Sequence, residues 1–223
     1  LTPATMPDIV AQALEVIDRG ERVLAIIPDK TRDDNTDFLF PLAVKLLRER
    51  GVASFDALVA QGTHPPMATE QKLAKVGLGE FSGTLFDHRW DSPEDLITLG
   101  ELNAEQVASL TGGLLSDSVA VSLNKLLAPG VYDTVVIFGA TVPHEVAGFA
   151  GGAKYFFPGV AGPELTHMTH WLGALAGIEN IIGNVDTPTR RLIESAADLV
   201  PARVVSLNTV VSRNQEGELL TYA

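Results

Sequence analysis

Runs of β-branched and other apolar residues alternate along this chain with segments in which apolar residues recur at helical spacing. Residues 22–27 form one such run, which ends at Pro28, a residue that cannot donate a hydrogen bond to a central strand ladder. A helical pattern over 39–49 and a second strand-like run over 55–60 follow. Strands separated by helices build a mostly parallel sheet with helices on both faces. We therefore predict a Rossmann-like α/β fold, with residues 1–223 forming one domain.

The same alternation extends along the rest of the chain. The further predicted elements are helices over 8–19, 69–76 and 188–197, buried strands over 132–138 and 202–211, and short strands near Leu85 and over 119–121. Because proline is tolerated only in the first turn of a helix, Pro41 sets the start of its helix at about residue 39. Thr69 is the expected N-cap of the helix that follows it.

The composition narrows the choice of partner. The chain has 223 residues, of which 46% are hydrophobic and 20% charged, and no apolar run approaches the roughly 18 residues of a membrane span. Its formal charge of -12 argues against nucleic acid, because phosphate neutralisation requires clustered lysine and arginine. The absence of cysteine excludes disulfides, a cysteine nucleophile and thiolate metal ligands. We expect a cytoplasmic protein that binds a small molecule and neither nucleic acid nor a membrane.

Most of the side chains suited to chemistry lie in a few short segments. Residues 61–64 and 141–154 each follow a predicted strand and hold His64, His144 and Lys154. The polar loop 29–32 follows the first strand in the same way. In open parallel sheets, ligands bind beyond the carboxyl ends of the strands. We therefore predict that these three loops meet at one edge of the sheet.

Each histidine has a catalytic and a structural interpretation. His64 and His144 have ordinary pKa values near neutrality, which suits general acid-base catalysis, but histidines at turns also satisfy backbone groups. His167 and His170 are three residues apart and would share a helix face, so that His144 could complete a zinc site with them.

The remaining candidates concern anion binding. Arg32 offers a fork of donors for phosphate or carboxylate, and Asp29 and Thr31 could bind a ribose hydroxyl or orient the loop; a solvated polar turn is the alternative. The glycine-rich segment 148–154 could bring backbone amides close to an anion, with Lys154 beside it. It lacks the spacing of a P-loop, and no G-x-G-x-x-G follows the first strand.

Four motifs in order carry a resemblance to a known family. They are Pro-Asp-x-Thr-Arg from residue 28, Gly-Thr-His-Pro from residue 62, Pro-His-x-x-Ala-Gly-Phe-x-Gly-Gly-x-Lys-x-x-x-Pro-Gly from residue 143, and the segment 164–170. Together they resemble the N-terminal domain of the nickel-dependent lactate racemase family. The resemblance implies that residues 1–223 form the N-terminal cofactor-binding domain, with the C-terminal domain of the family absent from this chain.

The family's cofactor is a nickel-pincer nucleotide, nickel pyridinium-3,5-bisthiocarboxylic acid mononucleotide, tethered to a lysine through one of its two sulfur-containing arms. The resemblance implies that Lys154 is the attachment point and that His170 is the protein ligand to nickel. It makes His64 and His144 the two catalytic bases. The cofactor-binding residues that it implies are Asp29, Thr31 and Arg32, facing ribose and phosphate, and Gly151 and Gly152, allowing close backbone approach.

The implied activity is racemisation or epimerisation of a lactate-like 2-hydroxy acid. One histidine takes the hydroxyl proton while hydride passes from the substrate carbon to the pyridinium, and hydride return to the opposite face inverts the centre. Cofactor-maturation enzymes are the implied protein partners. One departure from the family is Asp33, which replaces the common proline and, with Asp34, adds negative charge beside the expected phosphate site.

Two other functions are compatible with the residues. One is a nucleotide- or sugar-acid-binding domain without catalysis, in which Lys154 would carry no modification. The other is a zinc hydrolase, in which His144, His167 and His170 would bind the metal together.

Overall fold

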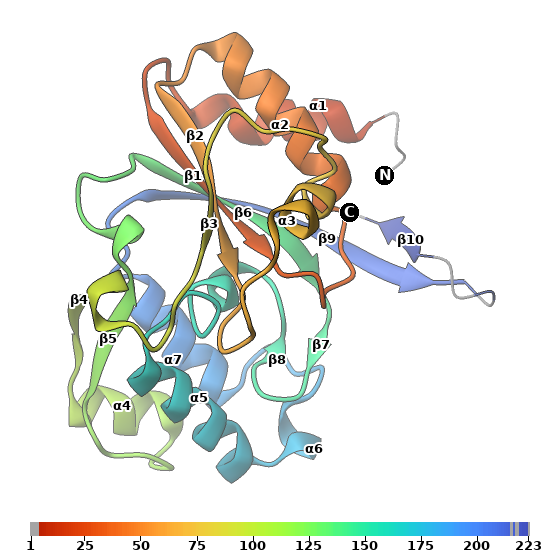
Figure 1. Cartoon of the computed structure of the whole chain (residues 1–223). Coiled ribbons are helices and arrows are strands. Elements are labelled where there is room, and N and C mark those ends of the chain that lie inside the picture. Colours follow the sequence, from red (N-terminus) through yellow and green to blue (C-terminus); the bar gives the residue numbers. More distant parts are fainter. Residues whose placement is uncertain (1–4, 215, 217–218, 223) are drawn as a thin grey trace.

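A six-stranded sheet with helices on both faces forms the body of the protein, as seen in a computed structural model that describes residues 5–214, 216 and 219–222 (Figure 1). The strand order is β10-β9-β6-β1-β2-β3. These strands are β1 (Arg22–Pro28), β2 (Ser54–Ala60), β3 (Leu85–Asp87), β6 (Thr134–Thr141), β9 (Arg203–Arg213) and β10 (Leu219–Tyr222). All neighbouring pairs are parallel except β9 and β10. The predicted mostly parallel α/β sheet is confirmed.

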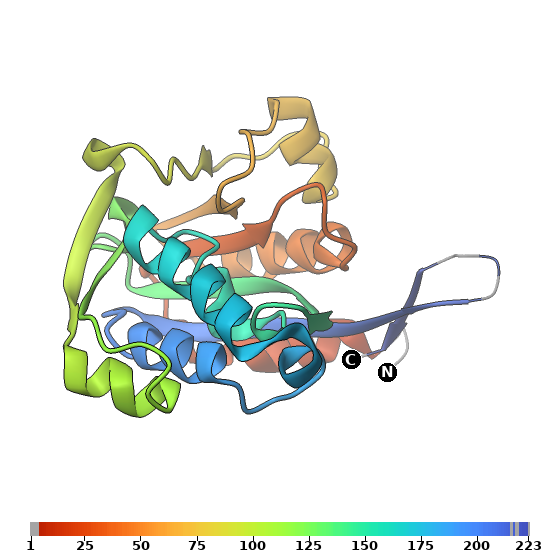
Figure 2. The same cartoon turned by 90° about the horizontal axis from the view of Figure 1, so that it is seen from below.

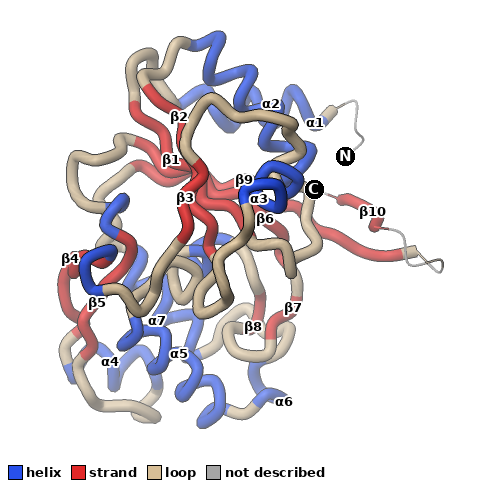
Figure 3. Tube along the Cα trace, in the orientation of Figure 1, coloured by secondary structure: helices blue, strands red, loops and turns tan. Residues whose placement is uncertain are grey.

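Helices cover the two faces in separate groups (Figures 1 and 2). On one side lie α1 (Met6–Ala13), α2 (Thr36–Arg50) and α3 (Thr69–Lys75), and on the other α4 (Ala104–Thr111), α5 (Pro163–Ala176), α6 (Ile178–Ile181) and α7 (Pro188–Ala197). Short 3-10 helices are η1 (Leu14–Val16), η2 (Pro93–Asp95), η3 (Lys125–Leu127) and η4 (Gly152–Tyr155). Two small antiparallel pairs, β4 (Leu96–Leu102) with β5 (Val119–Asn124) and β7 (Pro143–His144) with β8 (Gly148–Phe149), lie outside the main sheet (Figure 3). None of the described helices is long and apolar enough to cross a membrane.

The central strand β1 is buried on both faces, which explains its uninterrupted apolar sequence. Successive side chains of a strand point to opposite faces, so Val23 and Ile27 pack toward α1 and α2 while Leu24 and Ile26 pack toward the other helices. Each such fully buried aliphatic side chain stabilises the fold by roughly 1.5–3 kcal/mol. The hydrophobic clusters on the two faces of the sheet hold β1 in place, and therefore also the loop at its carboxyl end.

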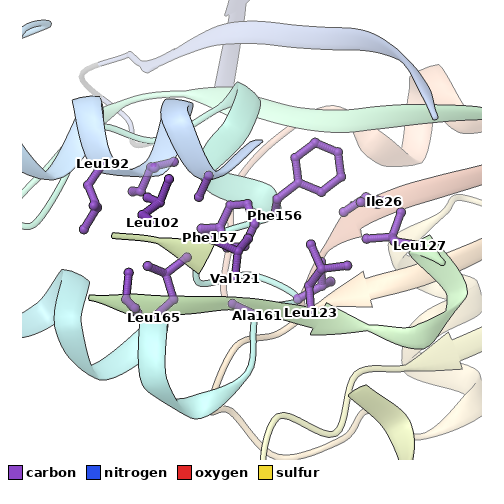
Figure 4. Close-up of a cluster of buried hydrophobic side chains, with 14 of the residues drawn as sticks. Ile26, Leu102, Val121, Leu123, Leu127, Phe156, Phe157, Ala161, Leu165 and Leu192 are labelled. Atoms are coloured by element: carbon purple, nitrogen blue, oxygen red, sulfur yellow. The ribbon is translucent and has the colours of Figure 1, made fainter. Parts of the chain in front are cut away.

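Two consecutive phenylalanines, Phe156 and Phe157, anchor the segment after η4 in the hydrophobic cluster that also contains Leu24 and Ile26 (Figure 4). Both side chains are almost fully buried, at 2% and 0% exposure, among residues of β5, α5 and α7 that include Val121, Leu165 and Leu192. The backbone beside Lys154 is thereby tied to the core of the protein.

Several predicted boundaries are wrong by a few residues. The helix predicted over 39–49 begins at Thr36, because the Asp34 carboxylate accepts a hydrogen bond from the Thr36 amide at 2.9 Å and starts the first turn early. Pro41 therefore lies in the second turn, where it leaves the Asp37 carbonyl without its helical donor. Gly77 accommodates this carbonyl, since a Cβ at residue 77 would lie only 2.0 Å from it.

Other elements differ in capping or burial. Ala68, rather than Thr69, is the N-cap of α3, and the Gln71 side chain accepts a hydrogen bond from its amide at 3.2 Å. In place of the single helix predicted over 8–19, the chain forms α1 followed directly by the 3-10 helix η1. Helix α7 matches its predicted bounds. The strand at 203–213 is not buried as predicted: Val204 and Val210 are exposed because β9 lies near the edge of the sheet. The elements that were not predicted include β4, β7, β8, β10, α4, α5 and α6.

Candidate active site

A cavity of about 600 Å³ lies at the carboxyl ends of β1, β2 and β6. The chain runs from β1 to β2 and β3 on one side of the sheet order and through β6 to β9 on the other, so the strand order reverses here, where open α/β sheets bind ligands. The predicted convergence of the three loops is confirmed. The predicted site residues that line the cavity are Asp29, Thr31, Arg32, His64, His144, Gly151, Lys154 and His170.

The cavity has two walls. We call residues 29–34 and 61–64, which follow β1 and β2, the His64 wall. We call residues 142–154, which follow β6, the His144 wall. The walls hold one candidate acid-base histidine each, in very different surroundings.

In the His64 wall, the His64 ring is paired with a buried carboxylate. His64 Nδ1 lies 2.5 Å from Asp29 Oδ2, while Asp29 Oδ1 accepts hydrogen bonds from the Thr31 amide at 3.0 Å and the Thr31 hydroxyl at 2.6 Å. Burial alone would raise the pKa of Asp29, but the hydrogen bonds from Thr31 and His64 lower it overall. The ionised carboxylate accepts the Nδ1 proton, so the Nε2 lone pair of neutral His64 is free to act as a base.

A lysine of α3 supports the same wall from behind. Lys75 Nζ lies 2.7 Å from Asp34 Oδ2 and 2.8 Å from the carbonyl oxygen of Arg32. The side chain of Asp34 is 1% exposed and that of Lys75 is 11% exposed, so this ion pair is sheltered from solvent. The negative charge that Asp34 was expected to bring to the phosphate site is therefore paired with Lys75. Of the two neighbouring aspartates, Asp33 and Asp34, only Asp33 lines the cavity.

The second loop of the His64 wall is held by buried polar groups. Gln61 Nε2 donates to the carbonyl oxygen of His88 at 3.0 Å and faces that of His64 at 3.4 Å. His88 is 1% exposed and its Nε2 lies 2.9 Å from the carbonyl oxygen of Ala161. Burial lowers the pKa of His88, so this residue is a neutral structural link between loops.

In the His144 wall, the His144 ring is buried and accepts a hydrogen bond. The Val146 amide donates to His144 Nδ1 at 3.0 Å, so the proton of the neutral ring is on Nε2. Burial and the charge of Lys154 lower the pKa of His144 to about 4, against the opposing effect of Glu145. In this state His144 is a neutral hydrogen-bond donor, the opposite of His64.

Lys154 lies on η4 with its amine among other cations. Burial lowers the pKa of Lys154 to about 8, and Arg32 and Arg190 add to this effect. Gly151 has a φ of 93°, a conformation that favours glycine, and a Cβ there would lie 2.9 Å from Thr141 Oγ1. Gly152 is not among the lining residues, and its amide donates to Asn208 Oδ1 at 3.4 Å.

Tyr155 fills the space between this segment and β6. The Ala140 amide donates to Tyr155 Oη at 3.3 Å, and burial raises the pKa of the phenol. The ring fits because residue 139 is glycine: a Cβ on Gly139 would lie 2.1 Å from Tyr155 Oη.

Of the two histidines on α5, His170 alone lines the cavity. His170 Nδ1 lies 2.7 Å from the carbonyl oxygen of Thr166, which fixes a proton on Nδ1 and leaves the Nε2 atom without a role in this contact. The His167 ring instead packs edge-on against Trp90, with 5.8 Å between ring centroids. Within the described ranges, no three histidine, aspartate or glutamate side chains converge as metal ligands, so the zinc site of His144, His167 and His170 is not formed.

Comparison with known proteins agrees with the family resemblance of the sequence motifs. The family model for the lactate racemase N-terminal domain matches residues 6–180. The chain belongs to the lactate racemase family. It is 26% identical to the lactate racemase of Thermoanaerobacterium thermosaccharolyticum in an alignment over 174 residues that covers 73% of this chain and 38% of the relative. It is also 26% identical to the lactate racemase of Lactiplantibacillus plantarum over 165 residues, 73% of this chain and 35% of the relative.

Solved structures support the lactate racemase family fold. A protein from Thermotoga maritima is similar over 100% of this chain and 54% of its own, with 32% identity and a TM-score of 0.90. The lactate racemase apoprotein of Thermoanaerobacterium thermosaccharolyticum shares the fold over 97% of this chain and 51% of its own, with a TM-score of 0.68 and 22% identity. The chain thus spans little more than a third of the curated relatives it matches and about half of these solved chains.

The residues that support the site, unlike most of those that line it, carry no signal in the sequence. All nine predicted site residues lie inside the range matched to the lactate racemase family. Sequence reasoning missed Lys75, Gln61 and Arg190, which hold the wall backbones through contacts with residues distant in sequence. Lys75 and Arg190 belong to helices, where a charged residue is ordinary, so no sequence signal marked them.

Proposed function

We propose that this chain is the cofactor-binding part of a cytoplasmic racemase or epimerase of a lactate-like 2-hydroxy acid. In this proposal the enzyme works with a nickel-pincer nucleotide that cofactor-maturation enzymes supply and that is tethered to Lys154. The observation that carries the proposal is the pairing, within one cavity, of a histidine poised as a base with one poised as a hydrogen-bond donor, beside a lysine of lowered pKa.

The residues present fit this cofactor. Lys154 offers an amine that is partly unprotonated near neutral pH, as bond formation to a thiocarboxylic arm requires. His170 offers the Nε2 of an imidazole whose other nitrogen is held by a carbonyl, the usual arrangement of a metal-binding histidine. Arg32 lines the cavity and suits the nucleotide phosphate. Because the cofactor carries its own sulfur ligands, this chain, which has no cysteine, could still hold its nickel.

Asp29 takes a different role from the ribose contact that the resemblance implies. Both of its oxygens are engaged, one by Thr31 and the other by His64. We assign Asp29 and Thr31 to orienting His64, so that its Nε2 can take the hydroxyl proton of the substrate. When bound, the pyridinium supplies a hydride acceptor for the substrate carbon.

His144 begins the reaction as a hydrogen-bond donor, whereas His64 begins it as a base. Its Nε2 proton can donate a hydrogen bond to the substrate oxygen while His64 removes the hydroxyl proton. Condensation of the Lys154 amine with a thiocarboxylic arm would form a C–N bond with loss of water, and the resulting thioamide would carry no charge. Attachment at Lys154 thus removes one cause of the low pKa of His144, which shifts this pKa toward neutrality and readies the ring for proton exchange in the reverse half of the reaction.

The decisive experiment measures nickel content and intact mass of the full-length protein produced together with the maturation enzymes. We expect nickel and a nucleotide-sized mass increment, both lost in Lys154→Ala. Lys125→Ala, which alters a lysine paired with Asp95 outside the cavity, is the matched control and should retain both. An unmodified, nickel-free protein from an active maturation system would favour a nucleotide- or sugar-acid-binding domain without catalysis.

A further inference from the structure

Arg190, on α7, holds the backbone that carries Lys154. Its side chain is 11% exposed. The guanidinium donates through Nη2 to the carbonyl oxygen of Phe149 and through Nη1 to that of Gly151, the latter at 3.4 Å. The Gly151 carbonyl also receives the Lys154 amide at 3.3 Å. Arg190 and Lys154 therefore share one acceptor, which links the guanidinium directly to the turn that presents the amine.

The charge of Arg190 is only weakly compensated. Its ion pair with Glu194 is long, with 3.9 Å between Nε and Oε1, and the Glu194 side chain is 63% exposed. The carbonyl partners of Arg190 are neutral. Arg190 thus adds to the positive field of Arg32 at Lys154, against the opposing charge of Glu145, and each of the two arginines lowers the pKa of the lysine.

We propose that Arg190 is a positioning residue that fixes residues 149–154 and keeps the Lys154 amine reactive toward a carboxylic or thiocarboxylic group. This inference rests on the proposed use of Lys154 as the attachment point, and it adds a residue that lies beyond the matched range 6–180. Arginine suits the task because its planar fork can bind two carbonyl groups at once while remaining charged.

Helix α7 is itself firmly placed. The Thr187 side chain caps the helix by accepting a hydrogen bond from the Arg190 amide at 3.0 Å, and Leu192 and Ile193 are fully buried in the core. The neighbouring Arg191 points elsewhere: its Nε donates to the carbonyl oxygen of Leu110 at 2.9 Å, and its Nη1 lies 2.5 Å from Asp186. Arg191 therefore provides a matched control with the same charge on the same helix.

The test titrates Lys154 in the protein free of cofactor. Acetic anhydride labels only unprotonated amines, and peptide mass spectrometry gives the labelled fraction of Lys154 as a function of pH. We expect a midpoint near pH 8 in the unaltered protein. In Arg190→Met the midpoint should rise by roughly half a pH unit or more, and hydrogen exchange over residues 149–154 should accelerate. Arg191→Met should change neither.

A second variant separates charge from geometry. Arg190→Lys keeps the charge but loses the fork, so we expect faster exchange over 149–154 with little change in the midpoint. If Arg190→Met does not fold, exchange in Arg190→Lys decides the question. The proposal is overturned if a folded Arg190→Met, or failing that Arg190→Lys, matches Arg191→Met in both measurements. Because no cofactor is present, failure of nucleotide attachment would count against the proposed function and leave this result unaffected.

Discussion

The two walls of the cavity present the same residue type to the same space in opposite states. His64 is half-exposed and donates its Nδ1 proton to a buried carboxylate, whereas His144 is buried and accepts a backbone hydrogen bond at Nδ1. In the His64 wall two buried carboxylates are paired, Asp29 with His64 and Asp34 with Lys75. The His144 wall instead carries a cation, Lys154, whose pKa is lowered further by Arg32 of the His64 wall and by Arg190 of α7. The contrast shows that neighbouring groups, rather than residue type, decide which ring nitrogen of each histidine carries the proton.

The most direct way to break this contrast is to neutralise the carboxylate behind His64. Asp29→Asn removes the acceptor that fixes the Nδ1 proton, so His64 Nε2 is no longer held as the base. We expect a loss of racemase activity of about 100- to 10,000-fold in the loaded full-length protein, measured as kcat. Asp95→Asn, which alters a carboxylate outside the cavity, should leave kcat unchanged. Retention of more than roughly a tenth of the activity in Asp29→Asn would remove Asp29 from the mechanism.

A second test concerns the support behind the His64 wall. Lys75→Met leaves the buried Asp34 carboxylate without its cation, and we expect the free energy of unfolding to fall by about 3–5 kcal/mol. Denaturant titration measures this change. Lys30→Met, in the adjacent loop where the lysine is exposed, is the control and should cost less than about 1 kcal/mol. Equal losses in the two variants would show that the buried pair has no special role.

The low pKa of His144 should make the free energy of unfolding depend on pH. The pKa of His144 falls from its ordinary 6.5 to about 4 in the folded protein, so between these values the unfolded chain takes up a proton that the folded protein does not. The stabilisation is complete above pH 6.5 and is lost as the pH falls toward 4. We expect the free energy of unfolding to decrease over this range by up to about 3 kcal/mol more in the unaltered protein than in His144→Gln. His167→Gln should follow the unaltered protein, and a His144→Gln curve parallel to it would contradict the prediction.

The smallest expected effect is that of the Lys154 charge on the pKa of His144. Removing the Lys154 charge should raise the pKa of His144 by roughly half a unit, because that charge is the second largest cause of its low value after burial. Titration of the His144 ring by NMR in Lys154→Met measures the change. Lys125→Met serves as the remote control. An unchanged or lowered pKa in Lys154→Met would disprove the proposed link between cofactor attachment and His144.

Much of this site could be predicted from sequence because it depends on strand order. Each chemistry-bearing loop follows a strand, and the carboxyl ends of parallel strands meet at one edge, so the convergence of Asp29, His64 and His144 followed from the alternation of elements. The state of each histidine could not be predicted in this way. The pairing of His64 with Asp29 joins two loops 35 residues apart, and it requires the exact register of β1 with β2.

Helix boundaries and supporting contacts could not be predicted from the sequence for a related reason. The position of Pro41 suggested a start near residue 39, but the Asp34 carboxylate starts the helix earlier and Gly77 makes room for the carbonyl that the proline leaves unbonded. Lys75 and Arg190 act through backbone carbonyls, which carry no sequence signature. Local patterns specify elements, whereas the details of the site come from groups brought together by folding.

The close approach of Tyr155 to Gly139 also has an evolutionary consequence. Since a Cβ on Gly139 would lie 2.1 Å from the phenol oxygen, a side chain at position 139 and an aromatic ring at position 155 exclude each other. The two positions must change together, the smaller residue at 155 first. A relative that carries alanine or a larger residue at the position of Gly139 is expected to lack tyrosine at the position of Tyr155, and that part of its cavity lining would then be formed by the strand rather than by the ring.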